Sequence, residues 1–163
     1  MDTITNILNW IDNSPFANAV RDSFWVFPSI ETIHVVAIVI VIGSITRLDM
    51  RLMGLIWRDR PVSEVSEEML PWTWASFVVA AVFGVMLWAS KPVTYFGIAF
   101  FDMKMVLILL AGLNMLVFQL GIYKSVGTWD SDPIPPPAVR LAGAVSMACW
   151  LCVVVCGRLI GFV

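Results

Sequence analysis

The sequence predicts an all-α protein: a four-transmembrane-helix bundle with an N-terminal amphipathic surface helix. Of its 163 residues, 60% are hydrophobic and 13% are charged. A soluble domain is about 45–50% apolar and about 25% charged. Four apolar segments each reach, or nearly reach, the ~20 residues that an α-helix needs to cross a bilayer. The length suits one small bundle, with the lipid bilayer as its immediate partner.

Residues 1–23 are predicted to form amphipathic helices at the membrane interface. Apolar residues recur at helical spacing on one face from Ile4 to Ile11. Asn13, Ser14 and Pro15 then interrupt the pattern. Because Ser is a good N-cap and Pro a good first helical residue, a second short helix is expected to begin at Pro15.

Residues 24–163 are predicted to form the transmembrane domain, with spans at about 24–46, 71–89, 97–123 and 141–163. Backbone polar groups must be satisfied within each segment in lipid, so the spans are expected to be helices. The charged connection 49–70 is expected to carry a helical extension of the first span along the surface. The proline-rich connection 124–139 is expected to be a stiff, solvated loop.

The distribution of Lys and Arg predicts the orientation. If the chain crosses four times, one side holds Arg47, Arg51, Arg58, Arg60, Lys124 and Arg140, and the other holds Arg21, Lys91 and Arg158. The side richer in positive charge is expected to be cytoplasmic. Both termini would then face the periplasm if the membrane is a bacterial inner membrane. No basic block is present, so nucleic acid is not an expected partner.

Ionisable residues inside the spans mark the candidate site, because such residues are costly in a membrane. Glu31 and His34, the single histidine of the chain, lie early in the first span. Lys104 lies early in the third span and Arg158 late in the fourth. With the predicted orientation, all of them fall in the outer half of the membrane, together with Asp102.

Three interpretations of this cluster remain open on the residues alone. His34 can be a hydrogen-bonding group that holds the helices together. It can also be an axial ligand of haem iron, oriented by Glu31, with Lys104 and Arg158 near the propionates. The third interpretation is a proton or ion path. A single histidine leaves the second axial position to a second subunit, to no ligand, or to one of the methionines Met86, Met103, Met105 and Met115.

Two other groups of residues are expected to have structural roles. Cys149, Cys152 and Cys156 share one face of the fourth span, where cysteine usually behaves as a small hydrophobe. Asp49 and Arg51, at the end of the first span, are interpreted as interfacial charges.

Several motifs carry a family resemblance. They are E-x-x-H from Glu31 to His34, R-L-D-M-R-L-M-G-L from Arg47, P-W-x-W from Pro71, F-x-x-K from Phe101 to Lys104, and G-R-L-I from Gly157. Together they resemble a family of uncharacterised four-span bacterial inner-membrane proteins. The chain is more distantly similar to cytochrome-b-like proteins of the copper-resistance D type and of the small membrane protoporphyrinogen oxidase type. That second resemblance implies a haem ligand at His34 and a functional lysine at Lys104.

The preferred hypothesis is therefore an integral membrane protein with a b-type haem that serves electron transfer near the periplasmic face. His34 would ligate the iron, and Glu31, Lys104 and Arg158 would complete the site. A stand-alone enzyme is the less favoured interpretation, and an enzyme of the porphyrin-oxidising kind stays open as an alternative. The alternatives are a non-catalytic accessory subunit of a larger membrane complex and a small transporter or proton path. The protein is expected to form a homo-oligomer or to be a subunit of a larger membrane complex.

Overall fold

The computed structural model describes residues 2–162 and contains only helices, turns and loops within that range. Its four long helices are α3 (Val26–Leu52), α4 (Val62–Ser90), α6 (Ala99–Leu120) and α7 (Pro137–Leu159). Each is long and apolar enough to cross a membrane, and in the fourth the apolar stretch extends through Phe162. The predicted four-span helical bundle is confirmed.

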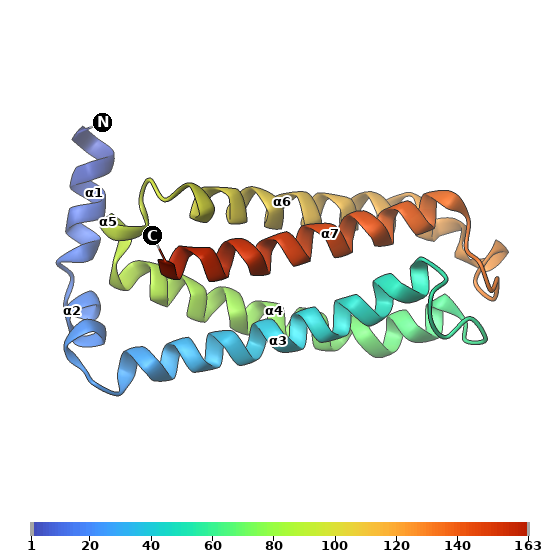
Figure 1. Cartoon of the computed structure of the whole chain (residues 1–163), viewed down its shortest axis with the longest axis horizontal. Coiled ribbons are helices and arrows are strands. Elements are labelled where there is room, and N and C mark those ends of the chain that lie inside the picture. Colours follow the sequence, from blue (N-terminus) through green and yellow to red (C-terminus); the bar gives the residue numbers. More distant parts are fainter. Residues whose placement is uncertain (1, 163) are drawn as a thin grey trace.

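The long helices run side by side and place both ends of the chain at the same end of the bundle (Figure 1). We call this the termini end, and the opposite one the loop end. Helix α3 packs most closely against α4, and α6 against α7. Contacts between α3 and α7 join these two pairs, whereas α4 and α6 meet little. The bundle is therefore closed on the α3–α7 side and loosely packed between α4 and α6.

Small residues allow the close packing of α3 against α4. Ala37 and Ala80 are buried, as are the hydroxyl-bearing residues Ser44, Thr73 and Ser76. The Thr73 hydroxyl donates to Ser44 Oγ at 2.8 Å, which links the two helices directly. Interfaces of this kind are typical of membrane helices, which gain little from the hydrophobic effect and associate through close packing and hydrogen bonds.

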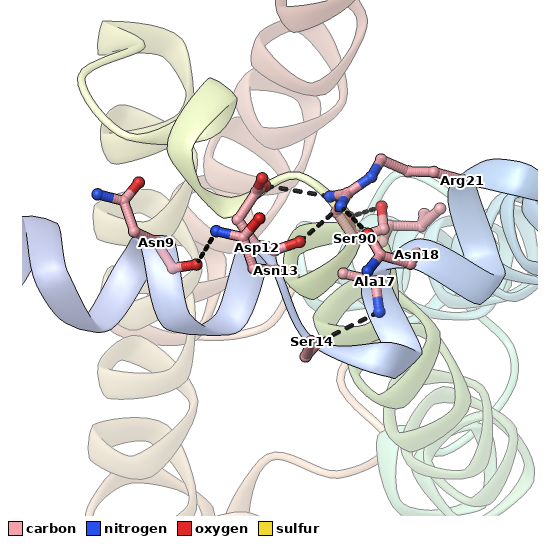
Figure 2. Close-up of polar contacts among 9 residues, drawn as sticks. Asn9, Asp12, Asn13, Ser14, Ala17, Asn18, Arg21 and Ser90 are labelled. Atoms are coloured by element: carbon pink, nitrogen blue, oxygen red, sulfur yellow. Dashed lines mark hydrogen bonds and ion pairs between the residues drawn. The ribbon is translucent and has the colours of Figure 1, made fainter.

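The N-terminal segment forms two short helices, α1 (Asp2–Asp12) and α2 (Pro15–Asp22), which lie across the termini end (Figure 1). As predicted, α2 begins at Pro15, and the Ser14 hydroxyl caps it by accepting from Ala17 N at 3.2 Å. Figure 2 shows how Arg21 fixes both helices to the bundle. Its guanidinium donates to the Asp12 side chain at 3.1 Å and to the Ser90 carbonyl, at the end of α4, at 2.5 Å.

The predicted helical extension of the first span is present as far as Leu52, but the predicted surface segment does not continue as a helix through residues 53–61. Helix α3 itself continues to Leu52, and α4 begins at Val62, so Pro71 lies inside α4 rather than at its start. The connection is reduced to residues 53–61. Arg51 and the three glutamates at 64, 67 and 68 belong to the ends of the two long helices, whereas residues 58–60 lie in the connection.

The predicted solvated loop at 124–139 is also corrected. The 3-10 helix η1 (Ile122–Thr128) follows α6, and the next residues fold over the loop end. Trp129 is buried and packs in the hydrophobic core of that end with Leu48, Leu52 and Val65. Asp130 caps α4, because its carboxylate accepts from the backbone N–H and the hydroxyl of Ser63 at 2.7 and 2.6 Å. The remaining short elements are α5 (Pro92–Tyr95) and η2 (Ile160–Phe162), at the termini end.

Candidate functional site

His34 lies on α3 and directs its imidazole toward α4. The ring atom Nδ1 is 2.7 Å from the carbonyl oxygen of Ala80. Since a carbonyl oxygen can only accept, Nδ1 carries a proton, and in the neutral imidazole Nε2 keeps its lone pair. The ring lies over Gly84, where an added Cβ would come within 2.8 Å of His34 Cε1. Glycine at this position therefore makes room for the imidazole between the two helices.

Glu31 and Lys104 lie near the imidazole, and Tyr95 lies near Glu31; we call the group of Glu31, His34, Tyr95 and Lys104 the His34 cluster. Glu31 and Lys104 both lie within electrostatic range of His34. Lys104 is half-buried, with its Nζ 5.0 Å from the centre of the Phe101 ring. Burial, and to a lesser degree the negative charge of Glu31, raise the pKa of the Tyr95 phenol above its ordinary value. The structure thus brings together three of the four predicted site residues and adds Tyr95.

Arg158, the fourth predicted residue, lies apart from this cluster. It is exposed, and its guanidinium is 4.7 Å from the centre of the Phe162 ring. Lys104 instead interacts electrostatically with Cys156 of α7. Residues two positions apart on an α-helix point about 200° apart around its axis, so Cys156 and Arg158 face opposite sides. The sequence placed Arg158 at the correct end of the bundle, and its position on the helix turns it away from the cluster.

The methionines proposed as second ligands are distributed over the bundle. Met103 and Met105 are exposed on α6. Met115 lines a cavity in the loop half of the bundle, away from His34. The described residues show no group of three His, Cys, Asp or Glu side chains placed to hold a metal ion. The cluster accordingly contributes one imidazole, that of His34, and the Glu31 carboxylate.

Sequence reasoning missed a second polar region at the loop end. Asp49 and Arg51, predicted to be interfacial, are 2% and 0% exposed. They do not neutralise each other, because the acidic residues near Arg51 are Asp130, Asp59 and Asp132. Arg51 donates through Nε to the Arg60 carbonyl at 2.8 Å, and through Nη2 to the Asp132 carbonyl at 3.1 Å. Arg51 therefore joins the end of α3 to the connection before α4 and to the loop after η1, and it forms no ion pair with Asp49.

The signal that could have identified this region is the position of Asp49 on its helix. If α3 continues past Arg47, Asp49 lies next to the buried positions Leu48 and Leu52 rather than in a connection. The helix is long enough to place the carboxylate beside α7. There, the Ser146 side chain is its hydrogen-bonding neighbour.

Comparison with known proteins gives one match. Residues 8–163 match a family of unknown function, DUF6644. The chain belongs to this family. No curated protein and no solved structure matches it.

Membership confirms the predicted resemblance to an uncharacterised family and assigns no activity to the DUF6644 chain. The match carries no link to cytochrome-b-like proteins, so that part of the resemblance stays a prediction. Evidence on the function of this DUF6644 protein therefore comes from its own residues. The cysteines offer little in this respect: all three are free, and Cys149 and Cys156 are buried in the bundle.

Proposed function

We propose that the protein is a b-type haem protein of the bacterial inner membrane, with His34 as the axial ligand that the chain supplies. The observation that carries the proposal is the contact between His34 Nδ1 and the Ala80 carbonyl. Histidines that ligate metals commonly donate their other ring N–H to a carbonyl, which fixes the tautomer and orients the ring. This contact leaves Nε2 with the lone pair that an iron ligand requires.

The neighbouring residues support an anionic group beside His34. Lys104 is half-buried, and no acidic residue forms a salt bridge with it among residues 2–162. Its ammonium would pair with a haem propionate, and Glu31, which is exposed, would lie at the rim of the site. The position of Arg158 favours an interfacial role over a propionate contact. A bound haem would supply one-electron redox chemistry, which suits electron transfer at the termini end.

The proposal also concerns orientation and partners. We infer from the Lys and Arg distribution that the termini end faces the periplasm. Because the chain supplies one imidazole, a six-coordinate haem would need a ligand from a second copy or from a larger membrane complex. Reporter domains fused to either terminus test the orientation, since an alkaline phosphatase fusion is active only outside the cytoplasm.

The decisive experiment is a visible spectrum of the purified protein in detergent, oxidised and then reduced, after expression with added haem precursor. We expect a Soret band and a sharp α band on reduction. His34→Ala should remove both bands. Lys104→Ala should lower haem occupancy, whereas Arg158→Ala should leave the spectrum unchanged, because Arg158 lies apart from the cluster.

Arg158→Ala is the matched control for Lys104→Ala, since each variant removes one positive charge from the termini end. A folded, colourless wild-type protein that also fails to bind added hemin would refute the proposal. Haem bands that persist in folded His34→Ala would equally refute the assignment of His34 as the ligand.

A second candidate function, a proton path, is favoured by the buried hydroxyl groups of the α3–α4 interface. Ser44, Thr73 and Ser76 lie between His34 at one end and Asp49 at the other. Proton flux into proteoliposomes, followed with an entrapped pH dye, tests this candidate. Flux that requires both His34 and Asp49 would favour it over the haem site, and flux equal to that of empty liposomes would exclude it.

A further inference from the structure

A cavity of about 130 Å³ lies in the loop half of the bundle, between α4 and α6. Helices α3 and α7 form its back wall. Trp74, which is 49% exposed, and the exposed Gly112 both line it, on α4 and α6 respectively. Because α4 and α6 meet little, the cavity opens toward the surface that faces lipid. A lipid-soluble molecule can therefore reach it without crossing water.

An unpaired carboxylate oxygen lies at the back of this cavity. Asp49 lines it and is 2% exposed, and its Oδ2 has no hydrogen-bond partner among the described residues. A buried polar atom without a partner costs about 1–3 kcal/mol, and more when the group is charged. The site therefore favours a ligand that brings a hydrogen-bond donor to Asp49.

Two amide side chains of α6 add to the polar part of the wall. Asn114 uses its Nδ2 to donate to the Ala142 carbonyl at 3.0 Å, which leaves its carbonyl oxygen for another group. Gln119 has no hydrogen-bond partner within residues 2–162. Together with Asp49, they provide a few convergent polar atoms in an otherwise apolar cavity, which is the usual composition of a small-molecule site.

Aromatic rings form much of the remaining wall. Trp74, Phe77 and Trp150 all line the cavity. The ring centres of Trp74 and Phe77 are 6.1 Å apart, and those of Phe77 and Trp150 are 6.2 Å apart, both in edge-to-face geometry. Aromatic rings pack well against another ring in such arrangements. An apolar cavity of about 150 Å³ is known to hold benzene, so this one is of a size to take a single aromatic ring.

We propose that the cavity binds the head of a lipid-soluble phenol or hydroquinone. The hydroxyl group donates to Asp49 Oδ2, the ring packs against Phe77 and its aromatic neighbours, and the tail leaves between α4 and α6 into the bilayer. A neutral ring enters this apolar site at lower cost than a charged amine, which would lose its hydration. The proposal is independent of the haem site, which lies at the other end of the bundle.

Binding to protein in lipid nanodiscs tests the proposal, with empty nanodiscs subtracted to remove partition into lipid. The probes are 4-hexylphenol and hexylbenzene, which differ by one hydroxyl group. We expect saturable 1:1 binding of the phenol, about 10- to 100-fold tighter than that of hexylbenzene, as a hydrogen bond to an otherwise unpaired buried group implies. Asp49→Leu should remove this preference. The control Asp102→Leu, which removes an exposed carboxylate from α6, should keep it.

Several results would overturn the proposal: no saturable binding, equal affinity for the two probes, or a preference that survives in Asp49→Leu. Tighter binding of 4-hexylbenzylamine than of the phenol would assign the site to cations instead. If Asp49→Leu does not fold, Gly112→Leu takes its place, because an added Cβ meets nothing within 4 Å. That variant keeps the carboxylate and partly fills the cavity, so it should weaken the binding of both probes. Unchanged affinities would mean that the probes bind outside this cavity.

Discussion

Replacing Gly84 with Ala tests how closely His34 is held between α3 and α4. The new Cβ would lie 2.8 Å from Cε1, 3.4 Å from Nδ1 and 3.7 Å from Nε2 of the imidazole. Ordinary contacts begin at 3.4 Å, so the ring must move by roughly 0.6 Å or the helices must separate. Either movement strains the 2.7 Å hydrogen bond between Nδ1 and the Ala80 carbonyl.

The energetic cost follows from two opposing effects. Overpacking a well-packed interface costs about 1–3 kcal/mol, and losing a buried hydrogen bond costs a similar amount. Alanine in place of glycine inside a helix stabilises the helix by about 1 kcal/mol. We therefore expect Gly84→Ala to destabilise the protein by about 1–2 kcal/mol and to move the imidazole away from Ala80.

The assay uses the fact that His34 is the only histidine. In protein labelled with ¹⁵N-histidine, wild type should give one set of imidazole signals, typical of the Nδ1–H tautomer. Gly84→Ala should shift these signals toward a mixture of tautomers. Gly43→Ala is the matched control, because its Cβ meets nothing within 4 Å, and it should raise the thermal stability slightly without changing the signals. Identical behaviour of the two variants would refute the packing argument.

Two further predictions concern the termini end. Arg21→Ala removes the hydrogen-bond donors that join α1, α2 and the Ser90 carbonyl, which costs about 2 kcal/mol after allowance for the partial exposure of Arg21. Amide hydrogen exchange in residues 2–22 should therefore rise about 30-fold. Unchanged exchange would contradict the role of Arg21 in docking the two helices. The raised pKa of Tyr95 means that its folded form keeps the phenolic proton to higher pH than the unfolded chain, so stability should fall as pH rises through that pKa. Glu31→Gln should lower the pKa of Tyr95 in an alkaline absorbance titration and leave Tyr123, at the other end of the bundle, unaffected.

The sequence was sufficient to predict the features that depend on local composition. Apolar segments of the right length predicted the four spans, and the Ser14–Pro15 pair predicted where α2 begins, because capping is decided by neighbouring residues. Topology alone placed His34 and Lys104 at one end of the bundle. The charged residues before Pro71, in contrast, hid the true start of α4, since a helix that protrudes from the apolar layer does not stand out in hydropathy.

The features that could not be predicted depend on how each helix is rotated about its axis. Arg158 and Cys156 differ by two positions, yet only Cys156 faces Lys104. The burial of Asp49 depends on the length of α3, and on a close approach to α7 at Gly143, where an added Cβ would lie 2.9 Å from the Asp49 carbonyl oxygen. Such contacts arise from the packing of segments that are far apart in the chain, so neither hydropathy nor residue spacing records them.

The stability of two variants can separate groups that hold the bundle together from groups kept for a ligand. His34 has its hydrogen bond, so His34→Ala removes both that bond and the packing of the imidazole between α3 and α4, and it should lower the stability by about 2–3 kcal/mol. Asp49 has an unpaired buried oxygen, and replacing such a group with an apolar residue of similar size is often stabilising. We therefore expect Asp49→Leu to raise the melting temperature of ligand-free protein in detergent. If Asp49→Leu instead lowers the stability as much as His34→Ala does, Asp49 is a structural residue. A group kept for a ligand should destabilise the protein while the ligand is absent, so its removal should not lower the stability.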